Sequence, residues 1–240
     1  MRKLLTLFAV AIATLFSAQA FAQLKVGGKA GLNLANQSFD YDDSDAEPAT
    51  NMRVGFHIGA AVEYGLSDDL AIQSGLLFTQ KGFSFDLEDD LPDGTSVDGY
   101  DRVSLSYLEI PISVAYKISD FQVYAGPYVA FGIAGRNNWD YTVEAGGVSE
   151  DYNDEISLKP SFGEVTEEDL ADDEDAFSAF DFGLNFGLGY QFGPMLVNAG
   201  YSLGLGNTFP AYDLEDFDRA DFNQNNRVIT VSLTYFFLDN

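Results

Sequence analysis

Residues Phe180 to Tyr190 read FDFGLNFGLGY, a run in which large apolar residues alternate with small or polar ones. A repeat of two is the period of a β-strand, because successive side chains of a strand point to opposite faces. One face of this strand is therefore aliphatic and aromatic, and the other carries glycine, asparagine and Asp181. The segment predicts a strand with one strongly apolar side.

The same pattern recurs in seven other segments, at residues 24–35, 53–64, 70–83, 103–118, 121–133, 195–205 and 227–237. Segments of this length match tilted strands that cross a membrane, and an even number of them fits a closed antiparallel barrel without edges. No helical segment could cover the apolar face in water. The sequence therefore predicts an all-β fold, an eight-stranded antiparallel up-and-down transmembrane β-barrel. A soluble exported β-barrel, with its apolar face inside, is the less favoured alternative.

The segment 103–118 changes phase. Val103, Leu105 and Tyr107 are odd-numbered, whereas the apolar residues from Leu108 onward are even-numbered. One extra residue would restore a single apolar face, so we expect a β-bulge near Tyr107 and Leu108.

The connections alternate between short and long. Three short ones lie near residues 65–69, 119–120 and 191–194, and four long ones cover about 36–52, 84–102, 135–179 and 206–226. The long connections hold 31 of the 38 acids of a chain whose net charge is -26. This plan predicts short periplasmic turns and long acidic extracellular loops. So strong a negative charge argues against nucleic acid as a partner, and the absence of cysteine excludes disulfides and cysteine-based metal sites.

The first residues indicate export. Arg2 and Lys3 precede an apolar run from Leu4 to Phe16, and small residues follow up to Ala22. This is the pattern of a secretory signal peptide. We expect a signal peptide at 1–22 and an outer-membrane β-barrel domain at 23–240, with outer-membrane lipid and the barrel assembly machinery as partners.

Strand alternation turns eight charged residues toward the barrel interior. We predict a lumen charge network of Lys25, Lys29, Arg53, Glu63, Lys81, Glu109, Lys117 and Asp181. Antiparallel counting places Lys25 near Glu63. In a narrow barrel such groups pair and fill the lumen; the alternative is a small-solute porin or channel.

Five stretches resemble one protein family: LKVGGKAGLNLA after the leader, YLEIPISVAY at 107–116, YAGPYVAFG at 124–132, DFGLNFGLGYQF at 181–192 and TVSLTYFF at 230–237. They are similar to the outer-membrane protein β-barrel family of Bacteroidota, often labelled the porin family. The resemblance implies a small eight-stranded outer-membrane barrel. Some members of that family are linked to secretion or adhesion.

His57 is the only histidine. As a catalytic base it would need a nucleophile and an orienting acid, and no G-x-S-x-G or H-E-x-x-H pattern is present. We therefore expect no enzyme activity and no cofactor, with an enzyme at the barrel rim as the less favoured alternative.

Acidic runs in the long connections are either solvated surface or loose sites for divalent cations, with Asp172, Asp173, Glu174 and Asp175 as the weak candidates for metal binding. Aromatic residues, among them Phe85, Trp139, Tyr141 and Tyr152, interleave with these acids. Tyrosine and tryptophan often anchor interfaces. We expect a non-enzymatic protein with a structural or recognition role through an acidic loop crown, whose extracellular ligand or protein the sequence does not identify.

Overall fold

The computed structural model describes residues 24–41, 50–91, 94–166, 174–212 and 222–239. The signal peptide predicted at 1–22 lies outside the described residues. Among the described residues no helix is long and apolar enough to cross a bilayer. Within the same residues the strands are β1 (Leu24–Tyr41), β2 (Arg53–Gly65), β3 (Leu70–Asp90), β4 (Ser96–Ile118), β5 (Phe121–Ala145), β6 (Val148–Ser161), β7 (Glu164–Val165), β8 (Glu174–Ser178), β9 (Phe180–Phe192), β10 (Met195–Gly204), β11 (Ala211–Tyr212) and β12 (Phe222–Asp239).

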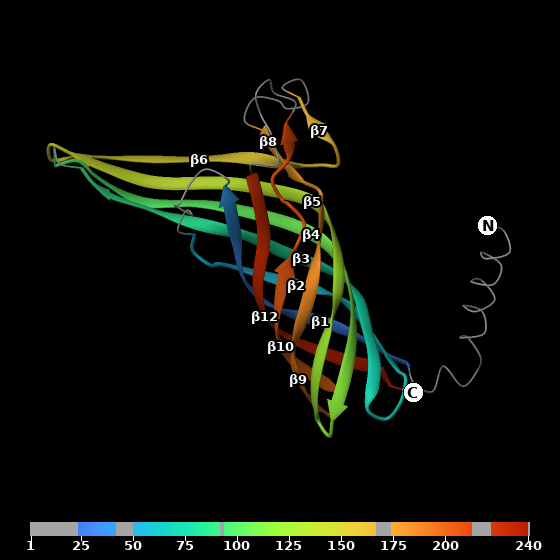
Figure 1. The fold of residues 1–240 in the computed structure, drawn as a ribbon. Coiled ribbons are helices and arrows are strands. Elements are labelled where there is room, and N and C mark those ends of the chain that lie inside the picture. The colour runs from blue at the N-terminus through green and yellow to red at the C-terminus, as the bar shows by residue number, and fades with distance from the viewer. Residues whose placement is uncertain (1–23, 42–49, 92–93, 167–173, 213–221, 240) are drawn as a thin grey trace.

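Antiparallel pairings close a ring in the order β1–β2–β3–β4–β5–β9–β10–β12 and back to β1. Leu32 of β1, for example, lies opposite Phe56 of β2 and Val231 of β12. The remaining strands lie outside this ring: β6 and β8 extend the sheet from β5, and β11 pairs with β7. The fold is therefore all-β and mostly antiparallel, with a closed barrel at its centre (Figure 1).

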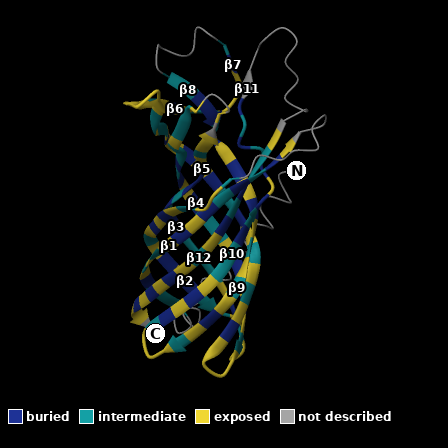
Figure 2. Cartoon of the chain, turned by 90° about the vertical axis from the view of Figure 1, so that its left-hand side faces the viewer, coloured by how far each residue is buried: buried dark blue, intermediate teal, exposed yellow. Residues whose placement is uncertain are grey.

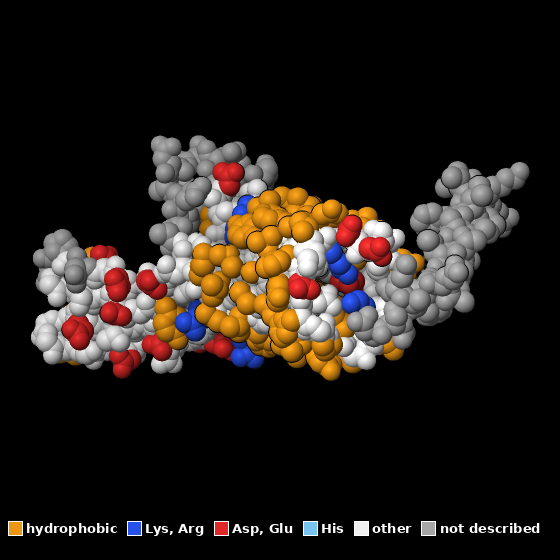
Figure 3. Space-filling view, turned by 90° about the horizontal axis from the view of Figure 1, so that it is seen from below, with side chains coloured by type: hydrophobic (Ala, Val, Ile, Leu, Met, Phe, Trp, Pro, Cys, Tyr) orange, Lys and Arg blue, Asp and Glu red, His pale blue; other side chains and the backbone are white. Residues whose placement is uncertain are grey.

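The barrel is apolar outside and polar inside, and burial alternates along the strands of its wall (Figure 2). Exposed apolar side chains cover the outer wall and form the orange surface of Figure 3. A soluble monomer rarely exposes an apolar surface of this extent. Examples are Val54, Phe56, Ile58, Leu76, Ile112, Val114, Leu184, Leu188, Val231 and Leu233. This arrangement fits a wall in contact with lipid and is the reverse of a soluble barrel.

Two ends of the barrel differ. The strand pairs β2–β3, β4–β5 and β9–β10 are joined by short turns at one end, here called the turn end, as the sequence predicted. The opposite end, here called the loop end, carries the long connections.

Two of the predicted long loops are mainly strands, so the expectation of loops there was wrong. β3 continues to Asp90 before β4 begins at Ser96, and β5 continues to Ala145 before β6 returns at Val148. Gly146 and Gly147, both at positive φ, form the two-residue turn between β5 and β6. Figure 1 shows β3, β4, β5 and β6 running together away from the barrel. We call residues 84–91, 94–103 and 136–156 the extension.

A β-bulge lies near Tyr107, as predicted, but its extra residue is in β5 and not in β4. β4 keeps one register with β3 from Leu70↔Tyr116 to Asp90↔Ser96. The shift lies in the β4–β5 ladder, where Ser106 pairs with Ala134 and Tyr107 with Gly132, so that Ile133 of β5 is the extra residue. The apolar Leu105 and Tyr107 therefore point inward and are buried, and past the bulge the odd-numbered residues of β5 share their face.

Candidate functional site

A buried lysine crosses the barrel near the loop end. Lys81 Nζ of β3 lies 2.8 Å from Glu109 Oε2 of β4 and 3.0 Å from Asp181 Oδ2 of β9. All three side chains are buried. Because a buried charge needs partners, this ion pair set fixes three strands of the ring against one another.

Neutral side chains complete this layer around Asp181. Its Oδ2 accepts hydrogen bonds from the Tyr128 hydroxyl at 3.1 Å and from Asn226 Nδ2 at 2.9 Å. Gln37 Nε2 in turn donates to Asn226 Oδ1 at 3.1 Å and to Thr208 Oγ1 at 3.0 Å. Lys81 Nζ also lies 4.1 Å from the Tyr128 ring centroid, a cation–π distance. The layer takes side chains from β1, β3, β4, β5, β9 and β12 and so fills the lumen at this level.

An apolar cluster covers this layer on the loop side. Tyr107 and Leu105 pack with Leu158 of β6 and Phe177 of β8, and the Tyr107 and Phe177 rings meet edge to face at 5.8 Å. The segment after the β5–β6 hairpin thus turns back over the barrel and closes it with apolar side chains.

A second polar layer lies near the turn end. Glu63, which is buried, pairs with Lys117 Nζ at 2.5 Å and accepts a hydrogen bond from Gln73 Nε2 at 2.7 Å. Gln73 also donates to Gln122 at 3.1 Å. Lys25 is the register partner of Glu63, as strand counting predicted, and its Nζ lies 5.7 Å from the ring centroid of Phe236.

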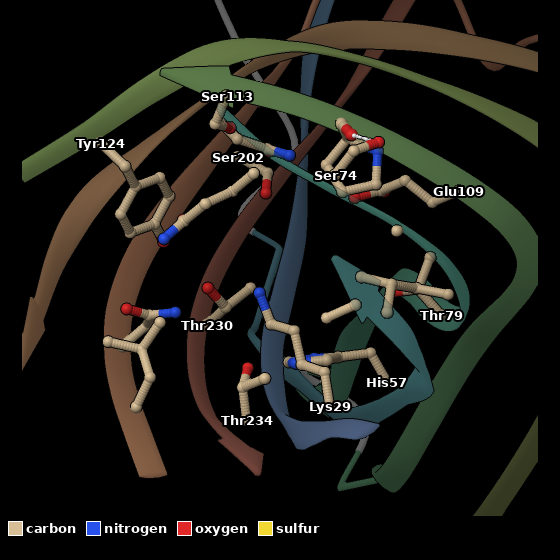
Figure 4. A pocket seen from close by; sticks show the side chains of 18 of the residues that line it. Lys29, His57, Ser74, Thr79, Glu109, Ser113, Tyr124, Ser202, Thr230 and Thr234 are labelled. Atoms are coloured by element: carbon tan, nitrogen blue, oxygen red, sulfur yellow. Dashed lines mark hydrogen bonds between the residues drawn. The ribbon is translucent and has the colours of Figure 1, made fainter. Parts of the chain in front are cut away.

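Lys29 and Arg53 are the two remaining members of the predicted lumen charge network. Lys29 lines a cavity of about 80 Å³ between the two layers (Figure 4), a volume that suits a few water molecules. Arg53 Nη1 reaches the Lys81 carbonyl oxygen at 3.5 Å, near the loop end of β2. The structure thus gathers Lys81, Glu109 and Asp181 into one group and Glu63 and Lys117 into another.

His57 lies inside the barrel and is buried. Its Nδ1 is 2.7 Å from Asn33 Oδ1, and Asn33 Nδ2 donates to Thr79 Oγ1 at 2.9 Å. His57 Nε2 has no hydrogen-bond partner among the described residues. An amide, rather than the acid of a catalytic triad, orients this imidazole.

Of the four weak candidates for metal binding, the structure describes two. Asp172 and Asp173 lie outside the described residues. Glu174 forms an ion pair with Lys159, and Asp175 Oδ1 accepts the Ala176 backbone N–H at 2.7 Å. In the part of the chain that the structure describes, no group of three or more acidic or histidine side chains could hold a metal ion.

The extension has two different faces. Directly paired residues of an antiparallel sheet share a face, so the register assigns every side chain. The face continuous with the barrel interior, here called the inner face, carries Phe85, Leu87, Asp89, Val97, Asp101, Val103, Trp139, Tyr141, Val143, Glu150, Tyr152, Asp154 and Ile156. The outer face carries Asp86, Glu88, Asp98, Tyr100, Arg102, Arg136, Asp140, Thr142, Glu144, Asp151 and Glu155. The acids of this region are visible at the left of Figure 3.

Asp101 is an acid set among aromatic neighbours. It pairs in register with Phe85 on one side and Trp139 on the other. Its Oδ1 is buried and has no hydrogen-bond partner among the described residues. Burial raises the pKa of Asp101, an effect opposed by hydrogen bonds from the Asn137 side chain and the Arg102 backbone. The cost of burying this carboxyl group is therefore only partly offset by hydrogen bonds.

Sequence reasoning missed the neutral partners inside the barrel and the inner face of the extension. Tyr128, Gln73 and Asn226 carry no charge and so gave no signal for a network. The alternation of Phe83, Phe85 and Leu87 with Ser84, Asp86 and Glu88 was present in the sequence, and the Gly146–Gly147 pair is a hairpin signal. Both were obscured by the density of acids.

A closed antiparallel ring with an apolar outer wall and a polar, filled interior defines a membrane β-barrel. The sequence match agrees: residues 17–210 fit the model of the outer membrane protein beta-barrel domain, and the chain belongs to this family. The match implies residence in the outer membrane. No curated protein is similar enough in sequence to count as a relative.

Solved structures with a similar chain course include Ail of Yersinia pestis, Neisserial surface protein A and the protease OmpT of Escherichia coli. Ail shares 13% identity, with 90% of this chain and 99% of Ail covered and a TM-score of 0.36. Neisserial surface protein A shares 12%, with 88% and 97% covered and a TM-score of 0.39. OmpT shares 11%, with 90% and 97% covered and a TM-score of 0.32. Structural similarity at this level does not show the role of this chain, which has to be inferred from its own residues.

Proposed function

We propose that this chain is a non-enzymatic, eight-stranded outer-membrane barrel that conducts no solutes and anchors the extension as a recognition surface outside the cell. The observation that carries this proposal is the continuation of β3, β4, β5 and β6 beyond the barrel as a sheet with an aromatic inner face and an acidic outer face. A barrel that served only as a membrane plug would need no such sheet.

The filled interior supports a closed barrel over a porin. The Lys81 layer joins β3 to β9 across the lumen, and the Glu63 layer joins side chains of strands that are not neighbours in the ring. The cavity between them is about 80 Å³, and the cluster around Tyr107 and Phe177 covers the loop end. An eight-stranded barrel is just wide enough for its own side chains.

The interior also supports a role without catalysis. His57 is held by Asn33, and the buried acids Glu63, Glu109 and Asp181 all pair with lysines. In this proposal lipid contacts the outer wall of the barrel, and the barrel assembly machinery inserts the protein into the outer membrane. The acidic extension faces the medium.

Three measurements test whether the protein is a closed outer-membrane barrel. Purified protein should migrate faster in unheated than in heated gel electrophoresis and should fractionate with outer membranes. In planar bilayers it should give no steady openings. Steady nanosiemens-scale conductance would favour the channel instead, and a protein that stays in solution without detergent would contradict the membrane barrel.

A further inference from the structure

The inner face of the extension is ordered in rows that cross its four strands. One row runs Phe85, Asp101, Trp139 and Asp154, and the next runs Leu87, Gly99, Tyr141 and Tyr152. The Tyr141 and Tyr152 rings stack at 5.3 Å. These side chains are half-buried, apart from the exposed Tyr152 and Asp154. The rows place flat rings beside carboxylates.

Charge determines what such a face can bind. The extension contains twelve acids, namely Asp86, Glu88, Asp89, Asp90, Asp98, Asp101, Asp140, Glu144, Glu150, Asp151, Asp154 and Glu155. Its bases are Arg102 and Arg136, and both lie on the outer face. Arg102 stacks over the Tyr100 ring at 4.4 Å and Arg136 pairs with Glu155. The inner face therefore has no cation of its own among the described residues.

The same charge argues against three occupants. The segments 42–49, 167–173 and 213–221 of this chain read DDSDAEPA, EEDLADD and DLEDFDRAD, so each carries the sign of the face it would cover. A second copy of the extension is acidic as well. Phosphate-rich or sulfated polymers are repelled for the same reason.

We propose that the inner face binds an arginine- or lysine-bearing segment of a partner protein, with cationic side chains stacked on Trp139 and the Tyr141–Tyr152 pair and their charge directed to Asp101. A guanidinium is planar and weakly hydrated, and it stacks on aromatic rings while it pairs with carboxylates. Complementary charge also steers the encounter. This inference rests on the proposed function, because it names the partner chemistry of the extension.

Asp101 determines where on the inner face the cation binds. Its Oδ1 is already buried without a hydrogen-bond partner, so the folded chain has lost the water of that oxygen before a partner arrives. A cation brought over Trp139 meets a charge that water does not screen well. The exposed acids of the outer face, such as Asp98, offer a screened attraction only.

The chain supplies its own reporter for the test, since Trp139 is the single tryptophan. Full-length protein in detergent is titrated with acetylated hexa-arginine amide while tryptophan emission is recorded. We expect a saturable change in emission with hexa-arginine, a weaker one with hexa-lysine and none with hexa-glutamate. No saturable change with hexa-arginine would overturn the inference.

Matched variants separate a site from diffuse attraction. Asp101→Asn and Asp98→Asn each remove one negative charge from β4, from the inner and the outer face respectively. Asp101→Asn and Tyr141→Ala should each weaken hexa-arginine binding about fivefold or more, the scale of one cation–π or desolvated charge contact. Asp98→Asn should change it less than about twofold. Equal losses for the two aspartate variants would contradict a site on the inner face.

Other occupants of the inner face would give different experimental results. If sedimentation shows a dimer that Trp139→Phe abolishes, a second copy is the occupant and the inference fails. If phosphatidylcholine vesicles shift the Trp139 emission as hexa-arginine does, the face is a lipid contact and the inference also fails. Should the extension prove to lie outside the cell yet bind no cationic peptide, the proposed function stands and only the partner class is wrong.

Discussion

Lys81 and Asp181 lie one hundred residues apart in the chain, yet Lys81 Nζ and Asp181 Oδ2 are 3.0 Å apart inside the barrel. β3 and β9 are not neighbours in the ring, so the contact crosses the lumen. Glu109 and Tyr128 complete the environment of the ammonium group. The ion pair therefore ties opposite walls together and occupies the space through which a solute would pass.

Removal of the lysine should be costly. Lys81→Ala leaves Glu109 and Asp181 as buried acids without their cation, a change that costs about 3–5 kcal/mol in comparable buried pairs. The folded band in unheated electrophoresis should be lost at a clearly lower temperature. The control is Arg136→Ala, because the Arg136–Glu155 pair is exposed and should contribute less than about 1 kcal/mol. A Lys81→Ala variant as heat-resistant as Arg136→Ala would show that the layer adds little.

Two glycines of β1 should respond differently to alanine. A Cβ at Gly31 would press on the Val231 carbonyl oxygen and lie 2.6 Å from His57 Cε1, whereas at Gly28 nothing lies within 4 Å. Gly31→Ala should therefore destabilise the barrel by about 1–3 kcal/mol, the usual cost of overpacking, and Gly28→Ala should be close to neutral. Urea unfolding of both variants in detergent measures the difference. Equal midpoints would mean that His57 and β12 do not pack against β1 as described.

The extension should become less stable as pH rises through the acidic range. Burial raises the pKa of Asp101, so the folded extension holds this proton more tightly than the unfolded chain does. Stability from this group is present when the carboxyl is protonated and is lost as pH rises through its folded pKa. Asp101→Asn should reduce this dependence and stabilise the extension at neutral pH. Urea titrations followed by Trp139 emission at about pH 4 and about pH 7 test it.

The same variant separates stability from binding. Asp101→Asn is expected to be more stable at neutral pH and yet to bind hexa-arginine less tightly. Such a result cannot come from partial unfolding. If the variant is less stable than the parent chain at neutral pH, Asp101 stabilises the sheet, and the predicted direction of the stability change is wrong.

The barrel was predictable because its wall has a strict period of two. Phe180 to Tyr190 and the last strand carry their apolar residues on one face throughout, and lipid is the only environment that suits such a face. Alternation also turned Glu63, Lys81, Glu109 and Asp181 inward, where the structure buries them. The prediction of Lys25 as a register neighbour of Glu63 followed from strand counting alone.

Alternation alone does not say whether an apolar face points to lipid or into the barrel, and this ambiguity explains why the extra residue of the bulge was expected in β4 and not in β5. Leu105 and Tyr107 were assigned to lipid because they are apolar, but Phe177 and Leu158 cover them inside the barrel mouth. Those partners lie tens of residues away in sequence. The extension was missed for a related reason: most of its acids occupy one face of a two-faced sheet, and in the sequence alone they resemble a solvated loop.

The central claim is that the barrel presents the extension outside the cell, and cysteine labelling tests it most directly. The chain has no cysteine, so Ser149→Cys at the start of β6 and Ser119→Cys in the turn between β4 and β5 each introduce a single thiol. With a membrane-impermeant maleimide on intact cells, we predict that Ser149→Cys is labelled and that Ser119→Cys is labelled only after the outer membrane is permeabilised. Labelling of Ser119→Cys but not Ser149→Cys on intact cells would contradict the account.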